Sequence, residues 1–187
     1  AANSKGITGA TKDAVVYAME STKKYKVDAS INGGYPYIEI SNFDGTPATE
    51  LNGAGTSASP YLISNAAELA YARNQINSGV WNTQTFKLTA DIDFNNQEWE
   101  PIGNDTNRFS GIFIGDNYEV SNLKITQNYD YVGFFGFINM GKVRNLGVNN
   151  INVNVSGSPK AGGFVGRIHY DGTEIENCYV KNSVIVT

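Results

Sequence analysis

Apolar and polar residues alternate along several short stretches of the chain. Residues 86–94 read FKLTADIDF, in which every second residue is apolar or small, and residues 151–156 read INVNVS in the same way. Successive side chains of a strand point to opposite faces, so this period of two predicts half-buried strands. The pattern therefore predicts a protein built mainly from short strands.

One short phrase occurs three times, as VSNLKI at 120–125, VRNLGV at 143–148 and IENCYV at 175–180. Each copy reads aliphatic, polar, Asn, Leu or Cys, any residue, aliphatic. Asparagine tolerates the left-handed backbone region better than other residues with a side chain, so we expect the chain to turn a corner at each Asn. Such a corner would let Val143 reach the same core as the inward pair Leu146 and Val148.

If the three phrases are equivalent, their residues should stack on successive turns of the chain, about 4.8 Å apart. We predict one column of corner asparagines and one apolar column beside it. The first column would contain Asn122, Asn145 and Asn177, and the second Leu123, Leu146 and Cys178.

A glycine–aromatic phrase precedes the last two Asn phrases. Gly133 and Gly136 recur as Gly163 and Gly166 at one constant offset, and FSGIF at 109–113 is a related stretch. A repeat of this size cannot bury its own apolar face, so neighbouring repeats must stack into one core. The fold class that we predict is all-β, a right-handed parallel β-helix (solenoid). A β-propeller is less suitable because one blade needs about 40 residues or more.

Residues 64–79, SNAAELAYARNQINSG, are the exception and predict an α-helix. Asn65 and Glu68 have the spacing of a capping box, and Gly79 suits the position after the helix end. An apolar stripe runs along the predicted helix and contains Leu69, Ala72 and Ile76. We expect this helix to cap the N-terminal end of the solenoid. A second, weaker helical pattern covers residues 11–22.

Residues 41–58 are rich in Gly, Ser, Thr and Pro, which is typical of a linker. We interpret residues 1–45 as an N-terminal segment, the tail of a preceding repeat module that includes a strand-like YPYIEI at 35–40. The linker then runs to about residue 58, and residues 46–187 form the β-helix domain.

Charged residues beside the Asn phrases predict a ladder on the outer face. The residue before each phrase gives the series Glu119, Lys142 and Glu174, and the second position gives the pair Arg144 and Glu176. Opposite charges on neighbouring strands favour one register. We expect these residues to pair between turns.

The composition of the chain argues against several classes of function. A formal net charge of −4 and a pI near 5.0 argue against binding nucleic acid, which needs a basic surface. No apolar stretch reaches the length of about 18 residues that a membrane helix requires, so we expect no membrane insertion. Cys178 is the only cysteine and His169 the only histidine, which excludes disulfides within the chain and two-His metal sites.

Candidate chemistry is sparse. No nucleophile elbow or phosphate-binding loop occurs, so we expect neither catalysis nor a cofactor. Asp91 and Asp93 share one face of the predicted strand at 86–94, where Ca²⁺ ligation is an alternative to a simple solvated surface. Exposed aromatic residues can stack on sugar rings, and the candidates for contact with carbohydrate or a partner are Tyr129, Tyr131 and Tyr170.

The order of these motifs resembles that of bacterial GLUG-motif surface proteins. The resemblance begins at GTSASPYLISNAAELAYARNQINSG and continues through FKLTADIDF, WEPIG, FSGIFIGDNYEVSNLKI, YVGFFGFI and GGFVG, over about residues 54–187. The family occurs in large secreted or wall-anchored proteins, including adhesin-like proteins and the non-catalytic parts of some bacterial immunoglobulin peptidases. The resemblance implies an extracellular, cell-surface stalk or binding module whose partner is a host or cell-surface protein or a glycan.

The function that we expect is a non-catalytic adhesion or spacer module. One alternative is a carbohydrate-binding or polysaccharide-degrading module on the same fold. Another is a self-assembling structural subunit, because a bare last turn ending at Thr187 would leave a strand edge free to recruit a second copy as a homo-oligomer or by head-to-tail association.

Overall fold

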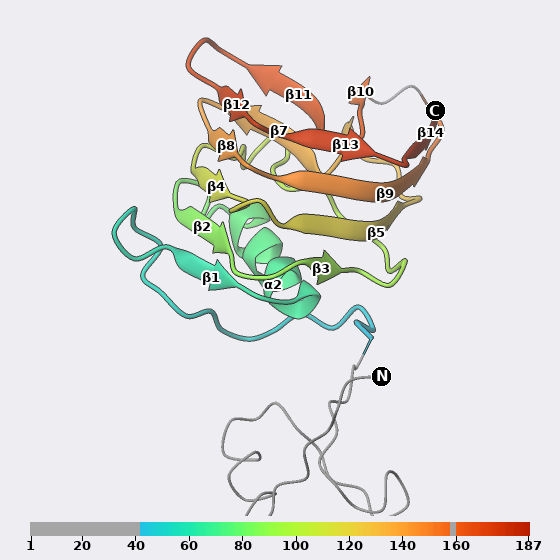
Figure 1. Ribbon diagram of the computed structural model, residues 1–187. Coiled ribbons are helices and arrows are strands. Elements are labelled where there is room, and N and C mark those ends of the chain that lie inside the picture. The colour runs from blue at the N-terminus through green and yellow to red at the C-terminus, as the bar shows by residue number, and fades with distance from the viewer. Residues whose placement is uncertain (1–41, 158–159) are drawn as a thin grey trace, which may run out of the picture. The chain divides into compact units, whose positions relative to one another are not determined.

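The computed structural model describes residues 42–157 and 160–187, so the expected helix at 11–22 and strand at 35–40 lie outside the described residues. The described chain is a parallel β-solenoid in which each turn lies on the turn before it (Figure 1). The predicted β-helix is confirmed.

The first sheet has five parallel strands, one from each turn of the chain. In spatial order they are β1 (Tyr61–Ile63), β2 (Thr85–Leu88), β4 (Ile112–Ile114), β8 (Lys142–Arg144) and β12 (Glu174–Glu176). Phe86 pairs with Phe113, and Phe113 pairs with Val143, so equivalent residues of these turns are 27 and 30 positions apart. Stacking in register places these apolar side chains in one inward column.

The second sheet continues each turn after the first corner (Figure 1). Its members are β3 (Ile92–Asp93), β5 (Glu119–Ile125), β9 (Gly147–Asn154), β13 (Tyr179–Lys181) and β14 (Val184–Val186). β5 and β9 each bend at an asparagine in their middle, and β13 and β14 both pair with β9 on either side of the equivalent bend.

Two short ladders complete the turns. They pair β6 (Tyr131–Val132) with β10 (Lys160–Ala161) and β7 (Phe135–Asn139) with β11 (Val165–His169). We call the β7–β11 ladder, with the segment 102–109 that bridges to β7, the third face. At the C-terminal end of helix α2 (Ala66–Asn77), the Asn77 side chain accepts a hydrogen bond from the Gly103 N–H, and the Asn77 carbonyl accepts one from the Asn107 side chain.

Helix α2 has the predicted boundaries and cap. The Asn65 side chain accepts from the Glu68 N–H at 2.9 Å, and Glu68 accepts in return from the Ser64 N–H at 2.7 Å. Gly79 follows the helix with φ +83°, a left-handed conformation that glycine adopts without steric cost. The predicted apolar stripe is buried in the common core, and it consists of Leu69, Ala72 and Ile76.

The core is one continuous cluster with a strong aromatic component. Trp99 and Phe134 stack with ring planes 3° apart, and Phe113 meets the Phe134 ring edge-on. Val143, like Leu146 and Val148, is at most 1% exposed, and Asn145 between them has φ +53°. The predicted Asn corner is therefore confirmed at this position.

The predicted single column of asparagines is wrong. Asn145 and Asn177 share a column and join their side chains by a hydrogen bond of 3.2 Å. Asn122 lies in a different column, where its Oδ1 accepts from Asn150 Nδ2 at 2.7 Å. The register explains the error, because Leu123 pairs with Ile151 and not with Leu146.

The same register corrects the predicted charge ladder. Lys142 pairs with Glu174 across β8 and β12, with Nζ and Oε1 2.7 Å apart, and Arg144 is the register partner of Glu176. Glu119, however, is not adjacent to Lys142 in the ladder. It instead contacts Lys181 through an ion pair and accepts a hydrogen bond from the Tyr179 hydroxyl.

Residues 42–58, the end of the predicted N-terminal segment and the predicted linker, contact the first turns. The Phe43 ring meets Phe94 edge-on at 4.9 Å, and Asn52 forms an antiparallel bridge with Leu62. At the other end, the last turn leaves apolar side chains partly exposed, including Ile175, Val180 and Ile185. The predicted self-association through this turn stays a prediction.

Candidate functional site

A surface hollow of about 240 Å³ lies next to the third face. Three carboxylates, two side-chain amides and two tyrosine rings contribute to its wall. The lining residues are Glu100, Pro101, Gly103, Asn104, Asp105, Asn128, Tyr129, Asp130 and Tyr131. Two of the three tyrosines predicted to contact carbohydrate therefore line one site.

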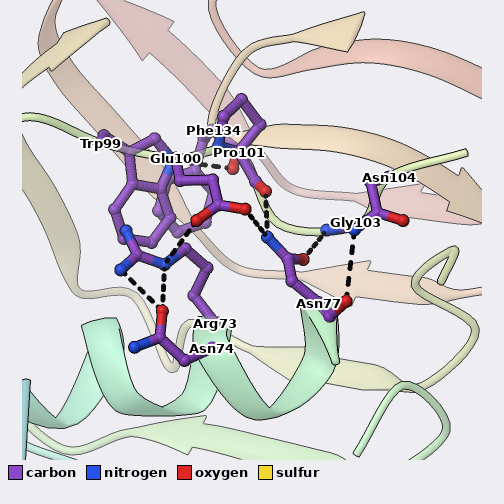
Figure 2. Close-up of polar contacts among 9 residues, drawn as sticks. All are labelled: Arg73, Asn74, Asn77, Trp99, Glu100, Pro101, Gly103, Asn104 and Phe134. Carbon is purple, nitrogen blue, oxygen red and sulfur yellow. Dashed lines mark hydrogen bonds and ion pairs between the residues drawn. The ribbon is translucent and has the colours of Figure 1, made fainter. Parts of the chain in front are cut away.

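Asn77 in the last turn of α2 fixes one wall of the hollow (Figure 2). Its Nδ2 donates to Glu100 Oε1 at 2.9 Å and to the Pro101 carbonyl at 3.0 Å, and its Oδ1 accepts from the Gly103 N–H at 2.7 Å. The Asn77 carbonyl accepts from the Asn104 side chain at 3.3 Å. One amide side chain thus holds the loop that follows Trp99 against the helix end.

Arg73 lies one turn earlier on α2, and its guanidinium approaches the Glu100 carboxylate (Figure 2). Its guanidinium donates twice to Asn74 Oδ1, at 3.0 and 2.8 Å, and lies 4.0 Å from Glu100 Oε2 and 5.1 Å from the Trp99 ring centre. The side chain is only 11% exposed. Burial lowers the pKa of Arg73, and the Glu100 carboxylate opposes this shift. Arg73 is thus held as a structural cation under the hollow.

Tyr129 and Tyr131 differ in how firmly they are held. Tyr129 is half-buried, and burial raises the pKa of its hydroxyl, as do the nearby carboxylates of Glu100 and Glu98. The Tyr131 hydroxyl accepts from Arg167 Nη1 at 2.7 Å and donates to Asp105 Oδ1 at 3.4 Å. The hollow thus offers rings for stacking together with carboxylates and amides that can bond to hydroxyl groups.

Tyr170, the third predicted contact residue, does not line this hollow. It follows β11 at the corner before β12, where its ring packs on His169 with centroids 3.7 Å apart. The side chain is 65% exposed, and the backbone is left-handed with φ +68°. Tyr170 therefore belongs to the corner of the third face.

The repeated glycines lie where backbones of neighbouring turns approach closely. The structure pairs Phe135 with Val165, the same offset that separates the two glycine phrases, which places Gly136 and Gly166 one above the other. A Cβ at Gly166 would lie 2.6 Å from the Val132 nitrogen, and one at Gly136 would overlap the Gly103 carbonyl oxygen. Gly133 and Gly163 are equivalent positions, and the first of them also faces backbone atoms. These glycines shape the fold around the site and bear no chemistry of their own.

The aspartates considered for Ca²⁺ bond to the backbone and to an amide. Asp91 Oδ1 accepts from the Glu119 N–H at 2.9 Å, and Asp93 Oδ1 accepts from the Asn95 N–H and from Asn122 Nδ2. Within residues 42–157 and 160–187, no group of three or more His, Cys, Asp or Glu side chains is arranged to hold a metal ion.

Sequence reasoning missed Arg73, Asn77 and Glu100. A charged residue within the apolar stripe of a helix is the one signal that the sequence gives for Arg73. The partners of Asn77 are 23 to 30 positions away along the chain, so no local pattern marks it.

Comparison with known proteins identifies a motif in the last turn. The family described as the GLUG motif matches residues 157–185. This stretch includes Gly163 and Gly166, so the chain carries a GLUG motif, as its resemblance to GLUG-motif proteins indicated. The match covers less of the chain than the resemblance did. No solved structure gives a significant match.

Two curated relatives match a longer part of the chain. A "Putative Gly-rich membrane protein" of Evansella cellulosilytica is 39% identical over 111 residues, which cover 57% of this chain and 13% of that protein. "Halomucin" of Haloquadratum walsbyi is 35% identical over 125 residues, which cover 59% of this chain and 1% of that protein. The chain thus matches only a small part of either relative. None of the helices in its described part is both long and apolar enough to span a bilayer.

Proposed function

We propose that residues 42–187 form a rigid, repeat-built segment of an extracellular surface protein, where they act as a spacer or adhesion module without catalysis. The main support is the parallel register of the first sheet, in which Phe86, Phe113 and Val143 stack turn on turn. Each turn of such a solenoid contacts mainly its neighbours, so the fold extends along one axis and offers long lateral surfaces. These properties suit a stalk.

The relatives support the location. One is named a membrane protein and the other a halomucin, and both are much longer than this chain. The GLUG motif in residues 157–185 fits a repeat segment within a long surface protein.

Antibody labelling of the cells that produce the protein tests the location. Antibodies raised against folded residues 42–187 should label intact cells, and brief external protease treatment should remove the label. Permeabilised cells from the same culture are the matched control. Labelling that requires permeabilisation would contradict an extracellular location.

Adhesion and catalysis need separate measurements. Beads coated with the folded protein should be retained on cells or immobilised glycans more strongly than beads coated with the heat-unfolded protein. The protein should release no new sugar ends from the polysaccharides that it binds. Release of new ends that persists after repurification would overturn the non-catalytic assignment, while equal retention of both bead types would leave only the spacer role.

The hollow favours a second candidate function, contact with a neutral glycan. Tyr129 and Tyr131 supply rings, while Glu100, Asp105 and Asn128 supply groups that bond to sugar hydroxyls. Tyr129→Ala should abolish retention on neutral glycans, whereas Tyr129→Phe, which keeps the ring, should preserve most of it. Equal retention of both variants and the unsubstituted protein would exclude this hollow as a glycan site.

A further inference from the structure

Phe137 on β7 is fully buried although it does not belong to the common core. Its ring is covered by guanidinium groups from the turns on either side. The Arg108 and Arg167 guanidinium carbons each lie 4.8 Å from the ring centroid. Cations within about 6 Å of an aromatic face are attracted by the ring.

These three residues form one column across the third face. Arg167 is the register partner of Phe137, and Arg108 precedes Phe109, whose N–H donates to the Phe137 carbonyl at 2.9 Å. We call Arg108, Phe137 and Arg167 the arginine column. Neighbouring turns are about 4.8 Å apart, so two guanidinium groups lie along the solenoid axis about two turns from each other.

Both guanidinium groups keep hydrogen-bond donors available. Arg167 Nη1 donates to the Tyr131 hydroxyl, and no carboxylate of the described residues lies within 4.0 Å of that guanidinium. Arg108 Nε donates to the Asp105 carbonyl at 3.3 Å, and its Nη2 lies 4.0 Å from Asp105 Oδ1, at the limit of an ion pair. Arginine carries five N–H donors in a planar fork that matches a carboxylate. The column can therefore accept an external anion.

Aromatic and apolar side chains flank the arginine column. Tyr131 meets the Phe137 ring edge-on at 4.9 Å. His169 also contacts the Phe137 ring edge-on, and its own ring packs on Tyr170. Tyr170 and its neighbour Met140 are 65% and 57% exposed, with φ +68° and +60°. A left-handed backbone is unfavourable for large side chains, and such strain concentrates at functional sites. The exposed Tyr170 ring and the half-buried Tyr131 ring are suited to stack on sugar rings.

We propose that the third face binds a carboxylate-bearing polysaccharide, with the arginine column holding uronate carboxylates and Tyr131 and Tyr170 stacking on the sugar rings. A nucleic acid would also combine anions with stacking. The arginine column supplies two guanidinium groups on a chain of net charge −4, whereas binding of nucleic acid relies on many phosphate contacts across a wide basic surface. Binding at this face goes beyond the spacer role, and it shares Tyr131 but not Tyr129 with the hollow.

Affinity electrophoresis of the folded protein in gels containing polygalacturonate tests the proposal. Gels with dextran, with dextran sulfate and with single-stranded DNA serve as comparisons. The protein should be retarded by polygalacturonate, and much less by dextran sulfate, DNA or dextran. Arg108→Gln and Arg167→Gln should each weaken binding to polygalacturonate about tenfold, as expected when one charge-assisted hydrogen-bond pair is lost.

Arg144→Gln is the matched control because Arg144 is an exposed arginine on β8, away from the third face. It changes net charge by the same amount and should alter binding less than twofold. Arg167→Lys keeps the charge but not the fork, and it remains useful if Arg167→Gln uncovers Phe137 and lowers stability. This variant should fold and still bind at least fivefold more weakly.

Tyr170→Asn separates binding from folding. Asparagine suits a left-handed corner, so the unfolding midpoint should not fall, whereas retardation by polygalacturonate should decrease severalfold. The proposal is overturned if polygalacturonate does not retard the protein or if Arg144→Gln weakens binding as much as the column variants. It is also overturned if Arg167→Lys binds normally, or if dextran sulfate or DNA retards the protein more strongly than polygalacturonate.

Discussion

The substitution Asn150→Ala should destabilise the solenoid although Asn150 is exposed and lies outside the core. Asn150 bends β9 with φ +55°, and its Nδ2 donates to Asn122 Oδ1 at 2.7 Å. Alanine in the left-handed region costs about 1–2 kcal/mol, and the lost hydrogen bond about 0.5–1.5 kcal/mol. The expected loss in free energy of unfolding is therefore about 1.5–3.5 kcal/mol.

Two further variants isolate the backbone contribution. Asn150→Gly also loses the hydrogen bond but adopts positive φ freely, so it should be more stable than the alanine variant by about 0.5–1 kcal/mol, after allowing for the greater flexibility of the unfolded glycine chain. Asn152→Ala is the matched control, because Asn152 is an exposed asparagine on the same strand outside the left-handed positions. It should change stability by less than about 0.5 kcal/mol.

Urea unfolding followed by tryptophan fluorescence, to which buried Trp99 and half-buried Trp81 both contribute, gives these differences as shifts in midpoint at constant slope. An alanine variant as stable as the unsubstituted protein would refute the reasoning. So would an alanine variant more stable than the glycine variant, because the corner would then not depend on left-handed geometry.

Three other consequences can be measured in the same way. Lys142→Glu should cost less than about 1 kcal/mol, since both Lys142 and Glu174 are more than half exposed, and adding Glu174→Lys should restore the loss. Hydrogen bonds from Lys181, and to a smaller extent from Tyr179, lower the pKa of the Glu119 carboxyl. The stability that ionised Glu119 contributes should therefore be complete above the ordinary pKa of glutamate and be lost as the pH falls through the lowered pKa. The variant Glu119→Gln should accordingly show a smaller decrease in stability at acid pH. Gly136→Ala should cost about 1–3 kcal/mol through overlap with backbone of the neighbouring turn, and a neutral result would contradict the close approach.

The sequence was sufficient to predict the repeat architecture but not the register of the Asn phrases. The last two turns each have two asparagine corners, the first at Asn145 or Asn177 and the second at Asn150 or Asn182. Both corners require the same local pattern of aliphatic residues around a left-handed Asn, so the phrase does not reveal which corner it encodes. The first two phrases start 23 positions apart, at Val120 and Val143, whereas β5 and β9 pair Val120 with Val148, 28 positions apart. The offset of the glycine phrases matches the pairing of β7 with β11.

The candidate site was predictable only where its residues carry a local signal. Tyr129 and Tyr131 lie in a polar stretch near a loop, which is enough to propose exposure. Arg73 and Asn77 become part of the site only because α2 packs against the loop after Trp99, and that contact joins segments that are far apart along the chain. The identity of such neighbours depends on tertiary packing, which periodicity does not encode.

A solenoid repeats nearly the same backbone at every turn. A corner whose residue type differs from that at the other corners therefore indicates a requirement other than folding. At two of its corners this chain uses asparagine, which tolerates the left-handed backbone at little cost. At the corner of the third face it uses Met140 and Tyr170, whose large side chains are exposed and strained. Folding alone would be served as well by asparagine there, as it is elsewhere in the same molecule. His169 connects this corner to the arginine column, because its ring contacts both Tyr170 and Phe137, the phenylalanine that Arg108 and Arg167 cover. The left-handed Met140 and Tyr170 and the arginine-covered Phe137 thus lie on the same face. A ligand that binds this face explains both features, whereas packing would need a separate reason for each.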